Sequence, residues 1–411
     1  MDDAKPMLMA IEDPWSLPGN ELSIHFQPIV SLKQSTVVGL EALVRPGHTS
    51  VGQLFAKARQ AGRLLELDRR CRARAMEEYR GLHLPRSLRP FLFLNIETSL
   101  IDERAEGSGA LLAAVLAEGL DPSDIVIELN ETQTSDTVTL KRFVERHREM
   151  GFLIALDDMG SGYSNLPRIA ELRPHIIKLD RSLVASVDRS FFKQETVKSL
   201  VLLGKTIGCL VLAEGVETQA ELDTCAALGA ELFQGFHLAR AKPTADLHLA
   251  ALQPMLKEAS RRQRSKAVAA IQARRKEGLD LLNLARTGCD VLRHRAPAVF
   301  DTVLAHWVSG NAMVEAAYAL DGEGLQISHT HLGQGIRPAG SRLFMPAQQG
   351  TDHANKEYFF SLRDTGLKQY ITDSYISLAT GQPCRTVAVM VEHSSAVDYV
   401  LCIDQRLSPL I

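Results

Sequence analysis

Eight short apolar segments between about residues 22 and 240 most restrict the fold of this chain. They are SIHFQPIV (23–30), VVGLEAL (37–43), PFLFLNI (90–96), DIVIEL (124–129), FLIALDD (152–158), HIIKLD (175–180), CLVLAEG (209–215) and AELFQGF (230–236). Most are continuously apolar, which is typical of strands buried on both faces of a parallel sheet. Helix-forming stretches lie between many of them. About eight strands in this length favour an α/β fold of the (β/α)8 TIM-type barrel, although the pattern alone leaves an open doubly wound sheet possible.

Nearly every strand after the first ends in a polar side chain. In chain order these residues are Glu41, Asn95, Glu128, Asp157 with Asp158, Lys178, Glu214 and Gln234. The carboxyl ends of barrel strands share one mouth, where the chemistry of such folds takes place. Carboxylates that converge there raise one another's pKa unless cations compensate. A single carboxylate after a strand is more often a helix N-cap or a solvated loop residue, but the whole series indicates a metal site.

The chemical types of these strand-end side chains indicate which metal ions they could bind and which reaction they could catalyse. Carboxylate and amide oxygens suit magnesium or manganese, and the lack of nearby His and Cys argues against zinc. Because Asp157 and Asp158 are adjacent, one could bridge two ions while the other completes the second site. Two ions about 3.5–4 Å apart serve in-line displacement at phosphorus.

These motifs together resemble the EAL-domain family of cyclic di-guanylate phosphodiesterases over about residues 20–245. The name-giving triplet is Glu41-Ala42-Leu43. The other matching motifs are FLFLNIE (91–97), IELNE (127–131), DDMGSGYSN (157–165), IIKLD (176–180), AEGVET (213–218) and QGFHLARAKP (234–243). Met159 and His175 depart from the family pattern, where Phe and Asp are usual, but no position of the expected metal set is lost.

The resemblance implies a metal-dependent hydrolase that converts cyclic di-GMP to linear 5′-pGpG. It implies two ions, Mg²⁺ or Mn²⁺, with the ligands Glu41, Asn95, Glu128, Asp157, Asp158 and Glu214. Catalytic roles are implied for Asp158, Lys178, Glu214 and Glu217, with Lys178 favouring the hydroxide form of a metal-bound water and Glu217 orienting it. Contacts to the dinucleotide are implied for Gln27, Leu43, Arg45 and Gln234, and Glu131 would anchor the loop after Asp158. The alternative is a catalytically silent receptor for cyclic di-GMP.

The sequence changes character after the barrel region, so we expect three parts. Residues 1–250 form the EAL-type domain, 251–285 a helical connector and 286–411 a small α+β domain. The basic run SRRQRSK (260–266) could be a nucleic-acid patch, but a solvated connector helix is commoner. Two hairpins are predicted in the last part, one turning at Asp321-Gly322 and one within 384–405.

The last part weakly resembles PAS- or Cache-type sensor modules. The resemblance rests on EAAYALDGEGLQIS (315–328), EYFFSL (357–362) and ITDSYISLATGQPCRTVAVMV (371–391). It implies a possible small-molecule ligand, while a domain that only dimerises is the alternative. In either case we expect a homodimer in which this domain regulates the barrel.

Charge and cysteine content restrict the partners and the location. A formal net charge of −3 gives no general attraction to DNA. Six scattered cysteines without a C-x-x-C pair are typical of thiols in a reducing compartment. Since no apolar run approaches about 18 residues, we expect no membrane span and a cytoplasmic protein.

Overall fold

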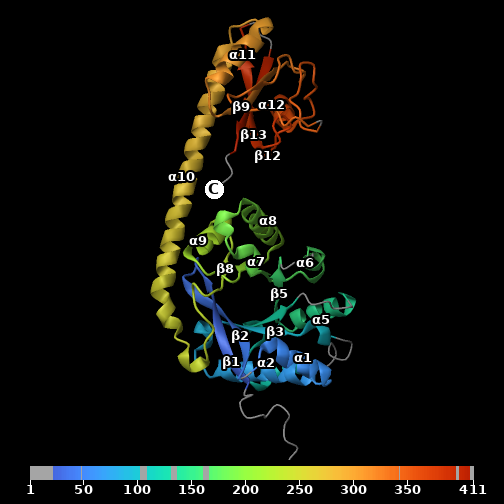
Figure 1. Cartoon of the computed structure of the whole chain (residues 1–411), viewed down its shortest axis with the longest axis vertical. Coiled ribbons are helices and arrows are strands. Elements are labelled where there is room, and N and C mark those ends of the chain that lie inside the picture. The colour runs from blue at the N-terminus through green and yellow to red at the C-terminus, as the bar shows by residue number, and fades with distance from the viewer. Residues whose placement is uncertain are drawn as a thin grey trace, which may run out of the picture. The chain divides into compact units, whose positions relative to one another are not determined.

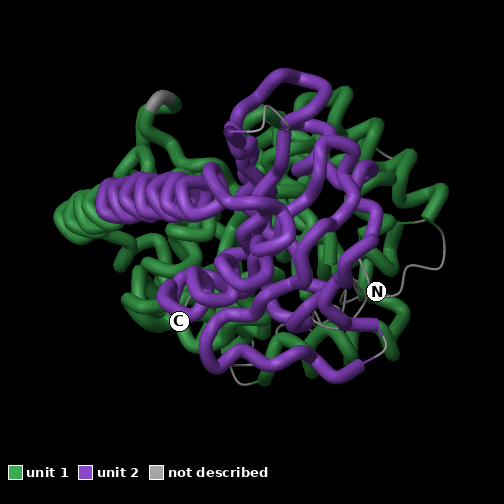
Figure 2. Tube along the Cα trace, turned by 90° about the horizontal axis from the view of Figure 1, so that it is seen from above, with its two compact units in different colours: residues 1–267 green, residues 268–411 purple. Residues whose placement is uncertain are grey.

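The computed structural model of the chain describes residues 22–47, 49–101, 109–130, 137–160, 166–341, 343–394 and 398–407. The chain divides into two compact units, residues 1–267 and 268–411 (Figures 1 and 2). Each unit has its own hydrophobic core and is described by itself. None of the described helices is both long enough and apolar enough to cross a lipid bilayer.

The first unit is a closed barrel of eight strands, which confirms the predicted TIM-type barrel. The strands are β1 (Leu22–Ser31), β2 (Thr36–Pro46), β3 (Phe91–Ile96), β4 (Ile125–Leu129), β5 (Leu153–Met159), β6 (Ile176–Leu179), β7 (Leu210–Ala213) and β8 (Leu232–Phe233). They are hydrogen-bonded in chain order, and β1 pairs with β8 to close the ring.

Helices pack on the outside of the barrel (Figure 1). They are α1 (Val51–Gln60), α2 (Leu64–Arg80), α4 (Ala110–Ala117), α5 (Thr137–Glu149), α6 (Leu166–Leu172), α7 (Arg181–Val184), α8 (Phe191–Ile207) and α9 (Gln219–Leu228). The sequence marks some of their ends clearly. Helix α9 begins with a capping box between Thr218 and Glu221 and ends at Gly229, which has a φ of 103°.

Strand β1 departs from the regular (β/α)8 pattern. It runs antiparallel to both of its neighbours, β2 and β8, whereas the pairs from β2 to β8 are parallel. Only residues 32–35 connect β1 to β2, and a connection this short makes a hairpin because a parallel crossover needs a dozen or more residues. The expectation of a parallel sheet is therefore wrong for β1 alone.

The second unit is built on an antiparallel sheet. Its elements after helix α10 (Gln253–Leu292) are α11 (Phe300–Ser309), β9 (Val314–Leu320), β10 (His331–Leu332), α12 (Glu357–Thr365), β11 (Gln369–Ile371), β12 (Tyr375–Ile376), β13 (Pro383–Glu392) and β14 (Asp398–Arg406). The sheet order is β10-β9-β14-β13-β11, with β12 paired to β13. The α+β character with an antiparallel sheet agrees with the sequence analysis, and the PAS/Cache-type assignment stays a prediction.

The two predicted hairpins have different outcomes. Strands β13 and β14 pair over their whole length, as predicted for 384–405. The chain also turns back after Asp321, whose carboxylate accepts hydrogen bonds from the N–H groups of Glu323 and Leu325. The returning segment pairs with β9 through a single bridge, Leu320 to Gln326, and then through the short β10. The second strand expected there is therefore shorter and later than predicted.

Helix α10 contributes to both cores. Leu256 and Ala259, near its start, are buried in the barrel core, and Leu281 and Leu292, near its end, are buried in the core of the second unit. The barrel unit therefore extends past residue 250, to about residue 267.

We predict that Leu256→Ala destabilises the barrel by about 2–4 kcal/mol, because it removes most of a fully buried side chain and leaves a cavity in the core. The matched control is Leu202→Ala on α8, where the side chain is 64% exposed and the change is expected to stay within about 0.5 kcal/mol. Urea unfolding of both variants measures the difference. Equal stability of the two variants would contradict the assignment of Leu256 to the barrel core.

Candidate active site

The polar residues of the site face the interior of the barrel because side chains alternate along a strand. An inner apolar layer contains Phe93, Val126, Ala155, Ile176, Leu212 and Leu232. Two residues further along each of these strands, and therefore on the same face, stand Asn95, Glu128, Asp157, Lys178, Glu214 and Gln234. The inner layer closes the barrel below them, and the polar residues form the next layer toward the mouth.

Lys178 is the centre of this layer. Its side chain is completely buried, and its Nζ lies 2.5 Å from Glu128 Oε1 and 2.8 Å from Glu214 Oε1. The same Nζ lies 3.2 Å from Asp157 Oδ1 and 3.6 Å from Glu41 Oε1. One ammonium group therefore holds together four carboxylates from four strands or strand ends.

The pKa shifts in the cluster follow from burial and from the presence of four carboxylates around a single ammonium group. Burial alone would lower the pKa of Lys178, but the surrounding carboxylates, with Glu128 and Glu214 foremost, hold it well above its usual value. Burial raises the pKa of Glu128 well above its usual value and that of Glu214 to about 8, and Lys178 only partly offsets this. Lys178 is therefore a cation, and the cluster has more acid than one cation can neutralise.

The pKa of Glu41 shifts in the opposite direction from those of Glu128 and Glu214. Burial opposes its ionisation, but Lys178 and two amide donors lower its pKa below the usual value. Asn95 Nδ2 donates to Oε1 at 3.3 Å, and Gln234 Nε2 donates to Oε2 at 2.5 Å. Gln27 pairs in register with Glu41 across the first hairpin, and its amide donates to the carbonyl of Ala239. Glu41 is thus held as a carboxylate from both sides.

Asp157 and Asp158 share the mouth only because strand β5 is irregular there. Adjacent residues on a regular strand point to opposite faces, but the register with β6 shifts between Leu156 and Met159. Asp158 has a φ of +58°, a left-handed conformation that is uncommon outside glycine and costs about 1 kcal/mol or more. Its N–H donates to Asp157 Oδ1 at 2.9 Å. The distortion brings both carboxylates to one pocket.

That pocket has a volume of about 540 Å³ and opens beside the cluster. Its wall includes Glu41, Asn95, Asp157 and Asp158, together with Leu43, Arg45 and Phe55. Burial and the neighbouring charge of Asp157 raise the pKa of Asp158. The pocket therefore combines an acidic floor with apolar and basic side chains toward solvent, and its volume suits a small ligand.

Glu217 and Glu131, both predicted from the sequence as site residues, are not among the described residues of the cluster around Lys178. Glu217 does not approach Lys178: Arg181 Nη1 and Nη2 bind its two carboxylate oxygens at 2.7 and 2.8 Å. No direct contact with Lys178 therefore supports its predicted role in orienting the nucleophile. Glu131 and the loop residues 161–165 lie outside the described residues.

The sequence analysis missed Asn130, which also lines the pocket. Its Oδ1 is buried and has no hydrogen-bond partner among the described residues. The signal was present, because Asn130 directly follows the apolar end of β4 just as the other site residues follow their strands. Arg59 and Arg72 also line the pocket, but they stand on helices, where nothing in the sequence distinguishes them from ordinary surface arginines.

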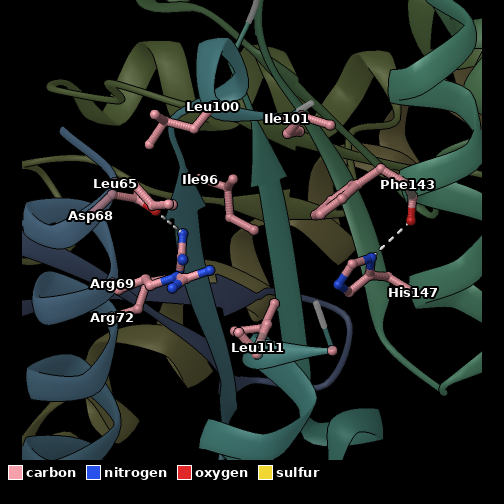
Figure 3. Close-up of a pocket in the computed structure, with 12 residues that line it drawn as sticks. Leu65, Asp68, Arg69, Arg72, Ile96, Leu100, Ile101, Leu111, Phe143 and His147 are labelled. Carbon is pink, nitrogen blue, oxygen red and sulfur yellow. Dashed lines mark hydrogen bonds and ion pairs between the residues drawn. The ribbon is translucent and has the colours of Figure 1, made fainter. Parts of the chain in front are cut away.

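A second, much smaller cavity, of about 50 Å³, lies between α2, β3 and α5 (Figure 3) and shares Asp68, Arg72 and Ile96 with the lining of this pocket. Three of its polar side chains, Asp68, Arg72 and His147, are bonded to protein groups. Arg72 pairs with Asp68, and His147 Nδ1 is bonded to the carbonyl oxygen of Phe143 at 2.8 Å. Burial lowers the pKa of His147, so the ring packs there as a neutral group, and we assign this cavity no chemical role.

The residues present fit a divalent cation. All the oxygen donors are carboxylates or amides, which are the ligands that Mg²⁺ and Mn²⁺ prefer. Glu128 Oε2 is buried without a hydrogen bond among the described residues, whereas Glu128 Oε1 and Glu214 Oε1 are in ion-pair contact with Lys178 Nζ. Within the described ranges, no three His, Cys, Asp or Glu side chains already surround one point at which a metal ion could bind. In this geometry the ammonium group of Lys178 occupies the centre instead.

The fold and the site together define a TIM-type barrel with an acidic cluster at the carboxyl ends of its strands. Residues 15–241 match the family model described as the EAL domain. This match covers more than half of the chain, and the chain belongs to the EAL-domain family.

Known relatives match the barrel region. The cyclic di-GMP phosphodiesterase NbdA of Pseudomonas aeruginosa is 32% identical over an alignment of 244 residues that covers 56% of this chain and 30% of NbdA. The chain spans less than half the length of three curated relatives that it matches, at 30, 35 and 45%. A solved complex of Klebsiella pneumoniae BlrP1 with manganese and cyclic di-GMP is 31% identical, with a TM-score of 0.50 over 56% of this chain and 58% of that one.

A further solved structure matches nearly the whole chain. The YkuI protein of Bacillus subtilis, with an EAL domain, is similar with a TM-score of 0.78 over 95% of this chain and 98% of that one. Its sequence identity is 24%, so the likeness concerns the fold.

We predict that Lys178→Met lowers the free energy of unfolding by about 3–5 kcal/mol in buffer with a chelator, because it leaves buried carboxylates without their cation. The matched control is Lys198→Met on α8, an exposed lysine paired with Glu195, where the loss is expected to stay below about 0.5 kcal/mol. Chemical denaturation measures both. A loss below 1 kcal/mol for Lys178→Met would contradict the central role of this ammonium group.

Proposed function

We propose that the chain is a metal-dependent phosphodiesterase that hydrolyses cyclic di-GMP to linear 5′-pGpG. The observation that carries the proposal is the buried Lys178 ammonium among four carboxylates, two of which, Glu41 and Asp157, line a 540 Å³ pocket. Support comes from NbdA, named a cyclic di-GMP phosphodiesterase, and from BlrP1, solved with manganese and cyclic di-GMP.

Two divalent ions, Mg²⁺ or Mn²⁺, would be held by residues that the barrel brings to its mouth. These are Glu41, Asn95, Glu128, Asp157, Asp158 and Glu214. When bound, the ions would draw negative charge from the oxygens of the phosphodiester. The surplus of acid over base in the cluster supports this assignment, because a cation would lower the pKa values that burial raises.

The residues of the chain itself would position the reacting groups. Lys178 keeps a positive charge directly behind Glu41 and Asp157, which line the pocket, and there it would orient the oxygen of an attacking water and stabilise negative charge that develops. Glu214, whose Oε1 lies 2.8 Å from Lys178 Nζ, would accept a hydrogen bond from that water. Both groups act where the phosphorus is attacked, so we expect them to affect the rate more than the affinity.

The walls of the pocket would bind the dinucleotide. Arg45 is exposed at the rim, and its planar guanidinium suits phosphate oxygens. Leu43 and Phe55 provide apolar surface for a guanine base. Gln27 and Gln234 are not among the residues that line the pocket, and their amide groups already donate to protein oxygens. Gln234 Oε1 is buried without a hydrogen bond among the described residues and is free to accept one.

We further propose that the protein is a cytoplasmic homodimer whose second unit regulates turnover. The six cysteines are free and buried thiols, which suits a reducing compartment. Helix α10 supports the regulatory part of the proposal, because it belongs to the core of both units and can transmit a change in one to the other.

We predict that Glu41→Ala and Asp157→Asn each reduce hydrolysis of cyclic di-GMP by at least a hundredfold while the barrel stays folded. The measurement is chromatographic detection of pGpG with added Mg²⁺ or Mn²⁺. The matched control is Glu195→Ala on α8, an exposed glutamate that is expected to keep the wild-type rate. If the wild-type protein bound cyclic di-GMP but did not hydrolyse it, the proposed phosphodiesterase function would be wrong, and the chain would instead be a catalytically silent receptor.

We predict that removing residues 268–411 changes the rate by several-fold to about a hundredfold, the usual size of coupling between sites. The truncation is placed at residue 267 so that Leu256 and Ala259 stay in the barrel core. Circular dichroism and sedimentation would establish folding and oligomeric state before the rates are compared. A folded monomeric barrel with the full-length rate would disprove the regulatory coupling.

A further inference from the structure

A cavity of about 310 Å³ lies in the second unit, on the α12 face of the sheet. Its inner wall includes Tyr318, Tyr358 and Asp404, all buried, and its rim includes the exposed Asp373 and Lys356. The volume is at the lower end of the range of about 300–1,000 Å³ that is usual for small-molecule sites. This cavity belongs to the second unit alone and is separate from the acidic cluster in the barrel.

Asp404 is the distinctive group of this cavity. It stands on β14 two residues after the fully buried Cys402, so it faces α12, and only 6% of it is exposed. Its Oδ1 accepts hydrogen bonds from the hydroxyl groups of Thr386, at 2.6 Å, and Tyr375, at 3.4 Å. Among the described residues its Oδ2 has no hydrogen bond, and no basic side chain lies within ion-pair distance.

A second buried carboxylate, that of Glu315, makes ionisation of Asp404 still less favourable. Glu315 on β9 is fully buried, and its Oε1 accepts a hydrogen bond from the hydroxyl of Thr380 at 2.5 Å. Its Oε2 has no hydrogen bond among the described residues. Burial raises the pKa of Asp404 to about 7, and the charge of Glu315 adds to the effect of burial. A cation beside Asp404 would relieve both costs.

The opposite wall cannot supply that cation, because its polar groups form a neutral chain of hydrogen bonds. The hydroxyl of Tyr318 donates to that of Tyr358, which donates to His353 Nδ1 at 2.6 Å. His353 Nε2 then donates to Gln326 Oε1 at 3.0 Å. Burial lowers the pKa of His353 to about 4, so its ring is neutral at physiological pH.

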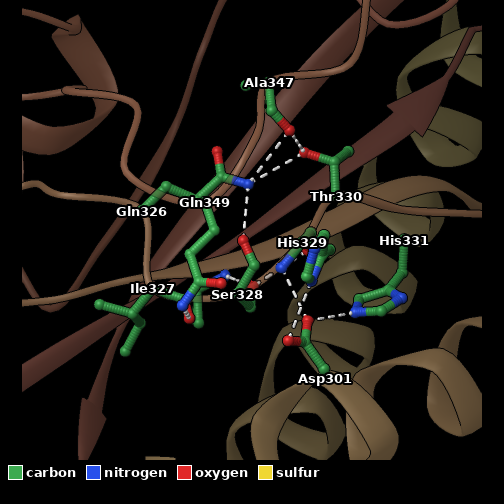
Figure 4. A network of polar contacts seen from close by, with 10 residues as sticks. Asp301, Gln326, Ile327, Ser328, His329, Thr330, His331, Ala347 and Gln349 are labelled. Atoms are coloured by element: carbon green, nitrogen blue, oxygen red, sulfur yellow. Dashed lines mark hydrogen bonds and ion pairs between the residues drawn. The ribbon is translucent and has the colours of Figure 1, made fainter.

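The far end of this chain is fixed by the loop that carries Thr330. The side-chain amide of Gln326 donates to the carbonyl oxygens of Ser328 and Ala347 and to the hydroxyl of Thr330 (Figure 4). Thr330 in turn donates to Ala347 O at 2.6 Å. Thr330 and Ala347 also line the cavity, so this wall is a preorganised aromatic and polar surface without a charge.

We propose that this cavity binds a small organic cation with a primary ammonium group, which donates to Oδ2 of Asp404 and packs against the aromatic wall. A buried carboxylate with one free oxygen supplies the charge and direction that an ammonium group needs. Aromatic rings add attraction for a cation. An anionic ligand would meet Asp404, Glu357 and Asp373 with only the exposed Lys356 to offset them.

Titration calorimetry of the full-length protein at constant pH tests the proposal with pairs of probes that differ only in charge. The pairs are butylamine with 1-butanol, 1,4-diaminobutane with 1,4-butanediol and 2-phenylethylamine with 2-phenylethanol. At least one amine is expected to bind, and its alcohol is expected to bind at least tenfold more weakly. This comparison uses the wild-type protein and needs no variant.

Asp404→Asn then locates the site, because the amide keeps an acceptor for Thr386 and Tyr375 but places an N–H₂ group or a neutral oxygen before the ligand. It is expected to weaken amine binding by about 10- to 100-fold. The matched control is Asp364→Asn, an exposed aspartate on α12 that does not line the cavity, expected to change affinity less than threefold. No amine binding at 10 mM, equal binding of the alcohols, or unchanged affinity in Asp404→Asn would each overturn the proposal.

Discussion

The ion-pair cluster around Lys178 is the interaction on which the rest of the barrel depends. A lysine that is fully buried is stable as a cation only if anions surround it, and here four carboxylates do so, on β2, β4 and β5 and directly after β7. The same carboxylates would repel one another without it. The cluster therefore joins strands that are far apart in sequence, and it also provides the site at which a divalent cation and a phosphodiester would meet.

The inner apolar layer sets the position of that cluster. Val126, Ile176 and Leu212 fill the barrel below the polar layer, and the alternation of side chains then places Glu128, Lys178 and Glu214 on one level. Strand β5 is the exception, because Asp158 reaches the mouth only through a register shift and a left-handed backbone. Local strain at this point serves the site rather than the stability of the fold.

The second unit uses the same physical principle in a different way. Its sheet also buries carboxylates, but Asp404 and Glu315 have no basic partner within the described residues. In the barrel, Lys178 offsets the free-energy cost of burying ionised carboxylates. In the second unit, the cationic ligand that we propose would do so. Helix α10 contributes buried residues to the core of each unit.

The sequence by itself determined the barrel and most of its site. Apolar runs that end in Glu41, Glu128 or Glu214 predict both the strands and the level of the site, because alternation is a local property. Only the tertiary structure decided the contacts between strands. It showed Lys178 at the centre, Glu217 paired with Arg181, and β1 antiparallel. These depend on which distant segments meet when the barrel closes, and hydrophobic pattern along one strand carries no information about its partners.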